Sequence, residues 1–185
     1  YSVNIAGNAN IYIENCDFGS NVIRISYVTN VVIRDSTSGK IDLVSEVSHA
    51  KIIGNTIKST ENAAIYIDDD INYVIIESNS IESGQVYVLG DNVQIRNNEI
   101  NLAAIPYYGI EIKPTADNTT VTGNVLYNSC SGTAAITDHG NNSVIIGNWI
   151  EDDDIWIRSD SINAKVCNNI LINGGIPIET GAVGL

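Results

Sequence analysis

The most constraining feature of the sequence is a short pattern that recurs eight times. Apolar residues alternate with other residues, and a turn-forming residue followed by asparagine closes the alternation, as in Val93-Gln-Ile95-Arg-Asn97-Asn98-Glu-Ile100. The asparagine position recurs every 19 to 26 residues, at Cys16, Ser36, Asn55, Asn79, Asn98, Asn124, Asn148 and Asn169. The preceding residue is Asn15, Asp35, Gly54, Ser78, Asn97, Gly123, Gly147 or Asn168. Because these residue types favour turns, the pattern predicts a bend at the same point of every repeat.

A second alternating segment lies between successive copies of this pattern. In each copy of this segment, two apolar residues separated by one residue are expected to point inward. These pairs are Val3/Ile5, Ile23/Ile25, Ile41/Leu43, Ile65/Ile67, Val86/Val88, Ile110/Ile112, Ala134/Ile136, Ile155/Ile157 and Ile176/Ile178. The chain also holds 32 Ile against 6 Leu, and β-branched side chains favour strands. Short strands separated by regular bends predict an all-β solenoid in which each strand pairs with the coils before and after it. We therefore predict a right-handed parallel β-helix of about eight coils, with residues 1–185 forming a single domain or an excised part of a longer solenoid.

The recurring asparagine position predicts an internal ladder. Adjacent coils of a β-helix lie about 4.8 Å apart, so inward amides can donate and accept hydrogen bonds along the axis. A buried amide needs such partners. A leucine-rich repeat has a similar consensus, but a second strand occupies the part of each repeat where its helix would be needed. The pattern therefore favours the β-helix, with Cys16 and Ser36 as the two rungs that lack an amide.

On the repeated Ile-x-x-Asn-x-Ile unit and the Gly-x-Ile-x-Ile strand, the chain resembles the pectate-lyase-like superfamily of right-handed parallel β-helices. That superfamily includes polysaccharide lyases, polygalacturonases, mannuronan epimerases, phage tailspikes and adhesin-like surface proteins. The resemblance covers nearly the whole chain and implies binding of long acidic or neutral glycans along an outer face, although a fold does not fix a function. The sequence lacks the polygalacturonase Gly-His-Gly, and Thr137-Asp138-His139-Gly140 lacks the proline of the epimerase Asp-Pro-His motif.

The overall charge limits the partners of this chain. A formal net charge of −13 repels phosphate backbones and anionic lipids, so we expect no nucleic-acid partner. We also expect no membrane insertion, because no apolar run approaches ~18 residues. The charge fits an extracellular protein or one on a cell or virion surface. Cys16, Cys130 and Cys167 are too widely spaced to predict a disulfide framework or a metal site, and the sequons at Asn118 and Asn141 leave glycosylation open.

Alternation in the second strand places rows of side chains outward across the coils. One row is Asn4, Arg24, Asp42, Tyr66, Tyr87, Glu111, Ala135, Trp156 and Pro177, and a parallel row is Ser26, Val44, Asp68, Leu89, Lys113, Thr137, Arg158 and Glu179. Aromatic rings can stack on sugars, and charged groups can bind hydroxyls or uronate carboxylates. We therefore predict a carbohydrate-binding face formed by Tyr66, Tyr87, Trp156, Asp68 and Lys113. The alternative is that aromatic residues simply favour exposed strand positions.

Chemistry on this face would need groups that transfer protons and a cation that neutralises a uronate. Asp138 and Glu111 are the candidate carboxylates and Arg158 is the candidate cation, as a polysaccharide lyase, an epimerase or a glycoside hydrolase would require. Nothing in the sequence singles these residues out, so catalysis stays an open question. We expect no cofactor and no metal site. The acidic runs 68–70 and 151–154 could bind Ca²⁺, but solvated acidic corners explain them as well.

A third set of residues points to assembly. The asparagine-bearing strands have the outward apolar residues Val32, Ile53, Ile75, Val144 and Ile146. Such a face, and the unpaired strands at the ends of a solenoid, favour contact with another chain. Two functions follow from the sequence. The first is an extracellular or surface module that engages polysaccharide, by binding or by degradation. The alternative is a structural fibre, spike or adhesin module without chemistry, which forms a homo-oligomer or stacks end to end.

Overall fold

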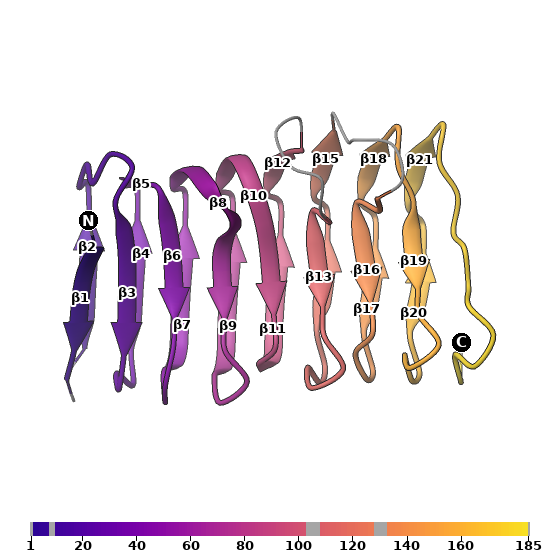
Figure 1. Cartoon of the computed structure of the whole chain (residues 1–185), viewed down its shortest axis with the longest axis horizontal. Helices are drawn as coiled ribbons and strands as arrows, with labels where there is room; N and C mark the ends of the chain where they lie inside the picture. The colour runs from indigo at the N-terminus through magenta and orange to yellow at the C-terminus, as the bar shows by residue number, and fades with distance from the viewer. Residues whose placement is uncertain (1, 8–9, 103–107, 128–132, 185) are drawn as a thin grey trace.

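The computed structural model describes residues 2–7, 10–102, 108–127 and 133–184. In this part of the chain, β-strands wind into one elongated stack of coils, and the two termini lie at opposite ends of it (Figure 1). None of the described residues is helical, so no helix there is long and apolar enough to span a membrane.

The coils supply strands to three faces, which we call the front, back and third sheets. The front sheet contains β1 (Ser2–Ala6), β3 (Val22–Ser26), β6 (Lys40–Leu43), the second halves of β8 (Thr56–Ile67) and β10 (Ser80–Val88), β13 (Ile110–Ile112), β16 (Ile136–Asp138) and β19 (Ile155–Ile157). The back sheet contains β2 (Ile11–Glu14), β4 (Val31–Arg34), β7 (Ser48–Ile53), β9 (Asn72–Glu77), β11 (Asp91–Arg96), β14 (Thr120–Thr122), β17 (Val144–Ile146) and β20 (Lys165–Cys167). The third sheet contains β5 (Thr37–Ser38), the first halves of β8 and β10, β12 (Glu99–Asn101), β15 (Val125–Tyr127), β18 (Trp149–Glu151) and β21 (Ile170–Ile172).

Strands of each sheet pair in parallel with the equivalent strands of the adjacent coils, as the sequence predicts. The eight strands of the back sheet correspond to the eight copies of the sequence pattern. Because β8 and β10 are long and bend between two faces, they join the front and third sheets into one hydrogen-bonded sheet. The fold is therefore an all-β parallel solenoid of eight turns within the described residues.

The interior is formed by columns of apolar side chains that stack in register along the axis. One column of the front sheet contains Ile25, Leu43, Ile67, Val88, Ile112, Asp138 and Ile157. The apolar members of this column are fully buried. Each buried Ile side chain stabilises the fold by roughly 1.5–3 kcal/mol, so the stacked columns are the main source of stability. Asp138 is the one charged residue of this column.

The asparagine ladder runs through this interior. From Asn55 to Asn169, the Nδ2 group of each ladder asparagine donates to the Oδ1 atom of the next at 2.9 to 3.0 Å. The backbone N–H of each donor residue bonds to the same oxygen. The rungs without an amide are bonded too, because Cys16 N donates to Ser36 Oγ and Ser36 N donates to Asn55 Oδ1, both at 3.1 Å.

The bend before the ladder is confirmed at every copy of the pattern. All eight residues at that position have a left-handed backbone, with φ between 50° and 67°. Five of them are Asn, Asp or Ser and three are Gly, and this matches the turn propensity that the sequence shows. The bend directs the ladder side chain inward after each back-sheet strand.

The structure corrects the register of one coil. Glu111 pairs with Thr137, and Thr137 pairs with Trp156, so Thr137 takes the place in the outward row that the sequence assigned to Ala135. Ala135 is instead fully buried. The second outward row consequently holds His139 where the sequence placed Thr137, since the backbone N–H of His139 bonds to Ile112 O. The sequence missed this shift because Ala134 and Ala135 are both small enough to be buried, so alternation does not distinguish them.

Candidate functional site

The outward surface of the front sheet carries the predicted aromatic residues. Tyr66 and Tyr87 lie on adjacent coils as a direct register pair, and their rings stack with centroids 5.5 Å apart and an angle of 12° between the planes. Trp156 lies farther along the same row, on the far side of Glu111 and Thr137. The row that the sequence predicts therefore exists, but only two of its three aromatic residues touch each other.

Cations lie beside each of these rings. Lys40 Nζ is 5.9 Å from the centre of the Tyr66 ring, and Lys113 Nζ is 5.4 Å from that of Tyr87. The guanidinium carbon of Arg158 is 5.2 Å from the centre of the Trp156 ring. Cation–π contacts of this kind favour the observed orientation of the rings, by about 0.5–1 kcal/mol at exposed sites.

Each cation is also paired with carboxylates. Lys40 Nζ lies 3.1 Å from Asp42 Oδ1 and 3.0 Å from Glu61 Oε2, and Lys113 Nζ lies 3.0 Å from Glu111 Oε1. Burial lowers the pKa of Lys40, but hydrogen bonds to Glu61 and Asp42 outweigh it and raise the pKa above its ordinary value. Burial likewise lowers the pKa of Lys113, but the hydrogen bond to Glu111, together with smaller favourable interactions, outweighs burial, so this pKa is also above its ordinary value. Both lysines therefore stay charged at neutral pH.

Tyr66 has a perturbed phenol. Burial raises the pKa of Tyr66 to about 12, and the neighbouring carboxylate of Asp68 adds to the shift. The Tyr66 hydroxyl donates to Asp68 Oδ1 at 3.2 Å. Asp68, which the sequence placed in the binding face, thus acts by fixing the orientation of the Tyr66 phenol.

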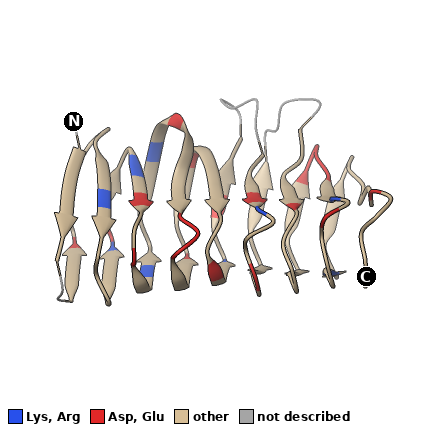
Figure 2. Cartoon of the chain, turned by 60° about the horizontal axis from the view of Figure 1, so that its bottom comes forward, with Lys and Arg blue, Asp and Glu red and all other residues tan. Residues whose placement is uncertain are grey.

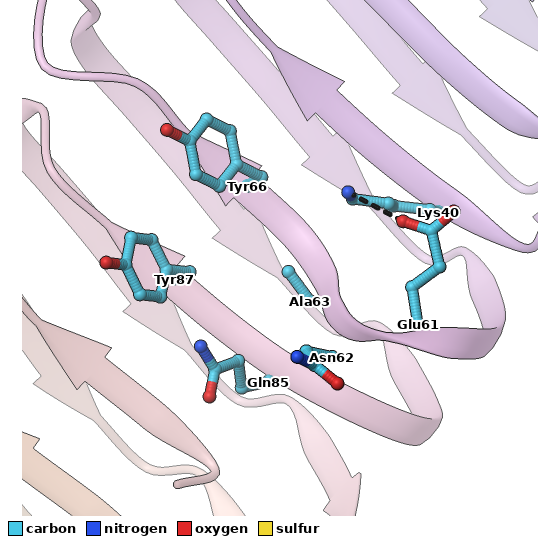
Figure 3. Close-up of a pocket in the computed structure, with 7 residues that line it drawn as sticks. All are labelled: Lys40, Glu61, Asn62, Ala63, Tyr66, Gln85 and Tyr87. Carbon is cyan, nitrogen blue, oxygen red and sulfur yellow. Dashed lines mark hydrogen bonds and ion pairs between the residues drawn. The ribbon is translucent and has the colours of Figure 1, made fainter. Parts of the chain in front are cut away.

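A depression of about 570 Å³ opens beside the two tyrosines. It is lined by Lys40, Glu61, Asn62, Ala63, Tyr66, Gln85 and Tyr87. Figure 3 shows the two tyrosine side chains on one side of it and the Lys40–Glu61 ion pair on the other. The lining thus combines aromatic rings, side-chain amides and a carboxylate in one place on the front sheet.

The far wall of the depression comes from extra residues in one coil. The ladder residues Asn55 and Asn79 are 24 residues apart, whereas Asn79 and Asn98 are 19 apart. The extra residues form an irregular stretch, which Ser59 stabilises by donating to Ala63 O and accepting from Glu61 N. In the next coil, a Cβ atom at Gly84 would lie 2.9 Å from Ala64 Cβ, so glycine is required for the two coils to pack here. The unequal coil lengths were the one signal in the sequence that could have pointed to this site.

Asp138, a catalytic candidate from the sequence, lies inside the solenoid. Its side chain takes a core position between Ile112 and Ile157 and is fully buried. Ser143 Oγ and Ser161 Oγ each donate to its carboxylate at 2.8 Å, and Gly140 N donates at 3.0 Å. Burial raises the pKa of Asp138, and these hydrogen bonds partly counteract that rise. The residue has the perturbed pKa of a functional group, but it is out of reach of a ligand on the outer face.

The other catalytic candidates lie on the outer face but not together. Glu111 is nearly buried, and it binds both Lys113 and Gln85, whose Nε2 lies 3.3 Å from Glu111 Oε2. Arg158 pairs with Glu179 at 3.0 Å. Glu111 and Arg158 belong to coils separated by the coil of Thr137, and Asp138 faces the interior, so the structure does not bring the three candidates together.

Acidic residues gather at the turn after β8. Carboxylate oxygens of Asp68, Asp69 and Asp70 lie within 4.8 Å of one another, and this is the one such group of potential metal ligands within the described ranges. Asp68 and Asp70 accept hydrogen bonds from Asp69 N and Glu46 N, respectively, so turn geometry accounts for their placement. In Figure 2, the front strands carry both basic and acidic segments, and acidic residues mark several of the turns.

The comparison with known families agrees with this geometry. Residues 39–183 match the family described as the right handed beta helix region. Because this match covers most of the chain, and the described coils form a parallel solenoid, the chain belongs to the right-handed β-helix family. A comparison with curated proteins gave no match. The family defines the architecture and the handedness of the coils, and the activity has to be argued from the front sheet itself.

Proposed function

We propose that this chain is an extracellular or surface-exposed β-helix module that binds a polysaccharide along its front sheet. The observation that carries the proposal is the depression beside Tyr66 and Tyr87, which combines stacked rings with polar groups. Ligand sites of this volume are usually lined by apolar and aromatic side chains with a few placed polar groups. A sugar ring has the matching character, because it presents both apolar C–H faces and hydroxyl groups.

The shape of the front sheet supports a long ligand. The outward row continues from Tyr66 and Tyr87 through Glu111 and Thr137 to Trp156 in unbroken parallel register. Tyr66, Tyr87 and Trp156 are the part-exposed members of this row, whereas Glu111 and Thr137 are buried. A long strand would therefore contact the row at its two aromatic ends. The cations that lie over the rings favour one orientation of these rings, which lowers the entropic cost of binding.

The placement of the acidic residues favours binding over turnover. Glycoside hydrolysis needs two carboxyl groups that face the ligand from opposite sides of the scissile bond. Asp138 faces the interior, and Glu111 is held by Lys113 and Gln85. We therefore expect incubation with a panel of polysaccharides to release neither new reducing ends nor unsaturated ends. Release of either product would show that the front sheet catalyses cleavage.

The proposal is tested by removing the aromatic side chains of the row. Tyr87→Ala and Trp156→Ala should each weaken retention in affinity electrophoresis on every polysaccharide that retains the wild-type chain, by roughly fivefold for a loss of about 1 kcal/mol. Trp149→Ala is the matched control, because Trp149 is exposed on the third sheet and not on the front sheet. Unchanged retention of both variants, or no retention of the wild-type chain on any polymer, would refute the proposal.

A second candidate function is a structural module that assembles with copies of itself. The observation that favours it is a column of exposed apolar side chains on the third sheet, where Val125, Trp149 and Ile170 pair in register and are 41%, 43% and 52% exposed. Contiguous apolar surface of this kind marks protein contacts. Light scattering across a wide concentration range tests it: assembly that Trp149→Glu abolishes supports the candidate, and a constant monomeric mass excludes it.

A further inference from the structure

The front sheet carries cations that are already neutralised. Its strands and the residues directly after them contain Arg24, Lys40, Lys113 and Arg158. Arg24 pairs with Asp42 at 2.9 Å, Lys40 with Asp42 and Glu61, Lys113 with Glu111, and Arg158 with Glu179. Asp68 and Asp154 add two further carboxylates, which accept hydrogen bonds from the Tyr66 hydroxyl and from Trp156 Nε1. Among the described residues, each of these four Lys and Arg side chains is thus paired with a carboxylate, and six carboxylates surround them. His139, directly after β16, is likewise held by Asp160 at 2.8 Å. A negatively charged ligand would therefore have to compete for each of these groups.

The depression also holds an acceptor without a donor. Gln85 is 6% exposed and lines the depression, and its Nε2 group donates to Glu111. Its Oε1 atom is buried and, among the described residues, has no hydrogen-bond partner. A buried acceptor without a donor is costly, so a ligand that supplies one is favoured. A hydroxyl group of a sugar ring can donate to this oxygen, and a carboxylate cannot, so the site favours a ring hydroxyl at this point over an anionic group.

From the pairing of these cations we infer that the front sheet selects neutral polysaccharides and rejects polyuronates, with Gln85 Oε1 as the acceptor for one ligand hydroxyl. This inference rests on the proposed binding function and names its substrate class. A uronate would have to displace a carboxylate from Lys40 or Lys113 and then lie beside that displaced carboxylate. A neutral strand leaves the ion pairs intact and uses the carboxylates as acceptors for its hydroxyls. The existing ion pairs therefore act as a filter on ligand charge.

The experiment compares binding of galactomannan, dextran and mixed-linkage glucan with binding of polygalacturonate and alginate by calorimetry. The wild-type chain should bind at least one neutral polymer and neither polyuronate. Because the net charge of −13 would itself repel a polyuronate, the measurement is repeated at about 0.5 M salt, where charges more than ~5 Å apart are screened. Rejection that persists at high salt arises from the contact surface and supports the inference.

The filter is tested directly by freeing the lysines. The double variant Glu61→Gln, Glu111→Gln removes one of the two carboxylates on Lys40 and the carboxylate on Lys113. It should bind polygalacturonate at least tenfold more tightly than the wild-type chain does. The matched control is Glu14→Gln, Glu77→Gln, which makes the same charge change and frees Arg34 and Arg96 on the back sheet. This control should bind polygalacturonate as weakly as the wild-type chain.

The outcomes separate the inference from the function on which it rests. Equal or tighter binding of a polyuronate by the wild-type chain overturns the charge filter but leaves polysaccharide binding standing. The filter is also overturned if the front-sheet variant gains no more affinity than the back-sheet control. If the wild-type chain binds none of the five polymers, the proposed function itself is wrong.

Discussion

Replacing Asn98 by alanine should be among the most destabilising changes in this chain. Asn98 Oδ1 accepts hydrogen bonds from the backbone N and the Nδ2 of Asn79, and its own Nδ2 donates to Asn124 Oδ1 and Ile76 O. The variant leaves the Asn79 backbone N–H and one N–H of the Asn79 Nδ2 group without their acceptor in the buried interior. Each unsatisfied buried group costs about 1–3 kcal/mol, so the free energy of unfolding should fall by roughly 2–6 kcal/mol.

The same substitution at Asn169, the last asparagine of the ladder, shows how much of this loss depends on burial. Asn169 accepts the equivalent two hydrogen bonds from Asn148 but is only partly buried. In Asn169→Ala, water can reach the freed groups, so the loss should be about 1 kcal/mol or less. Urea unfolding followed by far-ultraviolet circular dichroism measures both variants. Equal losses for the two, or a loss under about 1 kcal/mol for Asn98→Ala, would refute the claim that buried ladder bonds stabilise the fold.

Three further changes test the interior and the bends. Burial raises the pKa of Asp138 above the ordinary 3.8, so the folded chain binds a proton at Asp138 more tightly than the unfolded chain does. The free energy of unfolding should therefore fall as the pH rises from about 3.8 through the pKa of Asp138 in the folded chain. Asp138→Asn should make this fall shallower, and an unchanged pH dependence of the unfolding midpoint would contradict the assignment. Gly147→Val should lower the free energy of unfolding by about 1–2 kcal/mol through the backbone angle φ of 67° alone, because a Cβ atom there meets no atom within 4 Å. An unchanged free energy of unfolding would count against backbone strain at the bend. Ile95→Ala should lower the free energy of unfolding by roughly 2–5 kcal/mol, because the Ile95 side chain is fully buried. A loss below about 1 kcal/mol would show that the interior around Ile95 is loosely packed.

The features that the sequence predicts well are the periodic ones. The residue before each ladder position has a restricted chemistry, so eight bends could be placed from residue type alone, and all eight have positive φ. The outward position of Tyr66 and Tyr87 followed from alternation, because Ile65, Ile67, Val86 and Val88 are all buried as expected. Local chemistry that recurs once in every coil is therefore sufficient to define the coils and most of the front row.

The features that the sequence missed are those that break the period. Asp138 occupies a position that alternation assigns to an apolar residue. Hydroxyl groups of Ser143, five residues later in the same coil, and Ser161, in the next coil, make this possible. The depression depends on the non-repeating stretch around Ser59, which no alternation pattern describes. Both depend on contacts between coils, and such contacts become visible only when the register of the coils is known.

The central claim is that the front sheet binds a polysaccharide, and a crystal structure with a bound neutral oligosaccharide tests it most directly. We expect the sugar units to lie over the front strands, with one unit in the depression beside Tyr66 and Tyr87 and a donor hydroxyl at Gln85 Oε1. Sugar density on the back or third sheet alone, with the depression empty, would contradict the account.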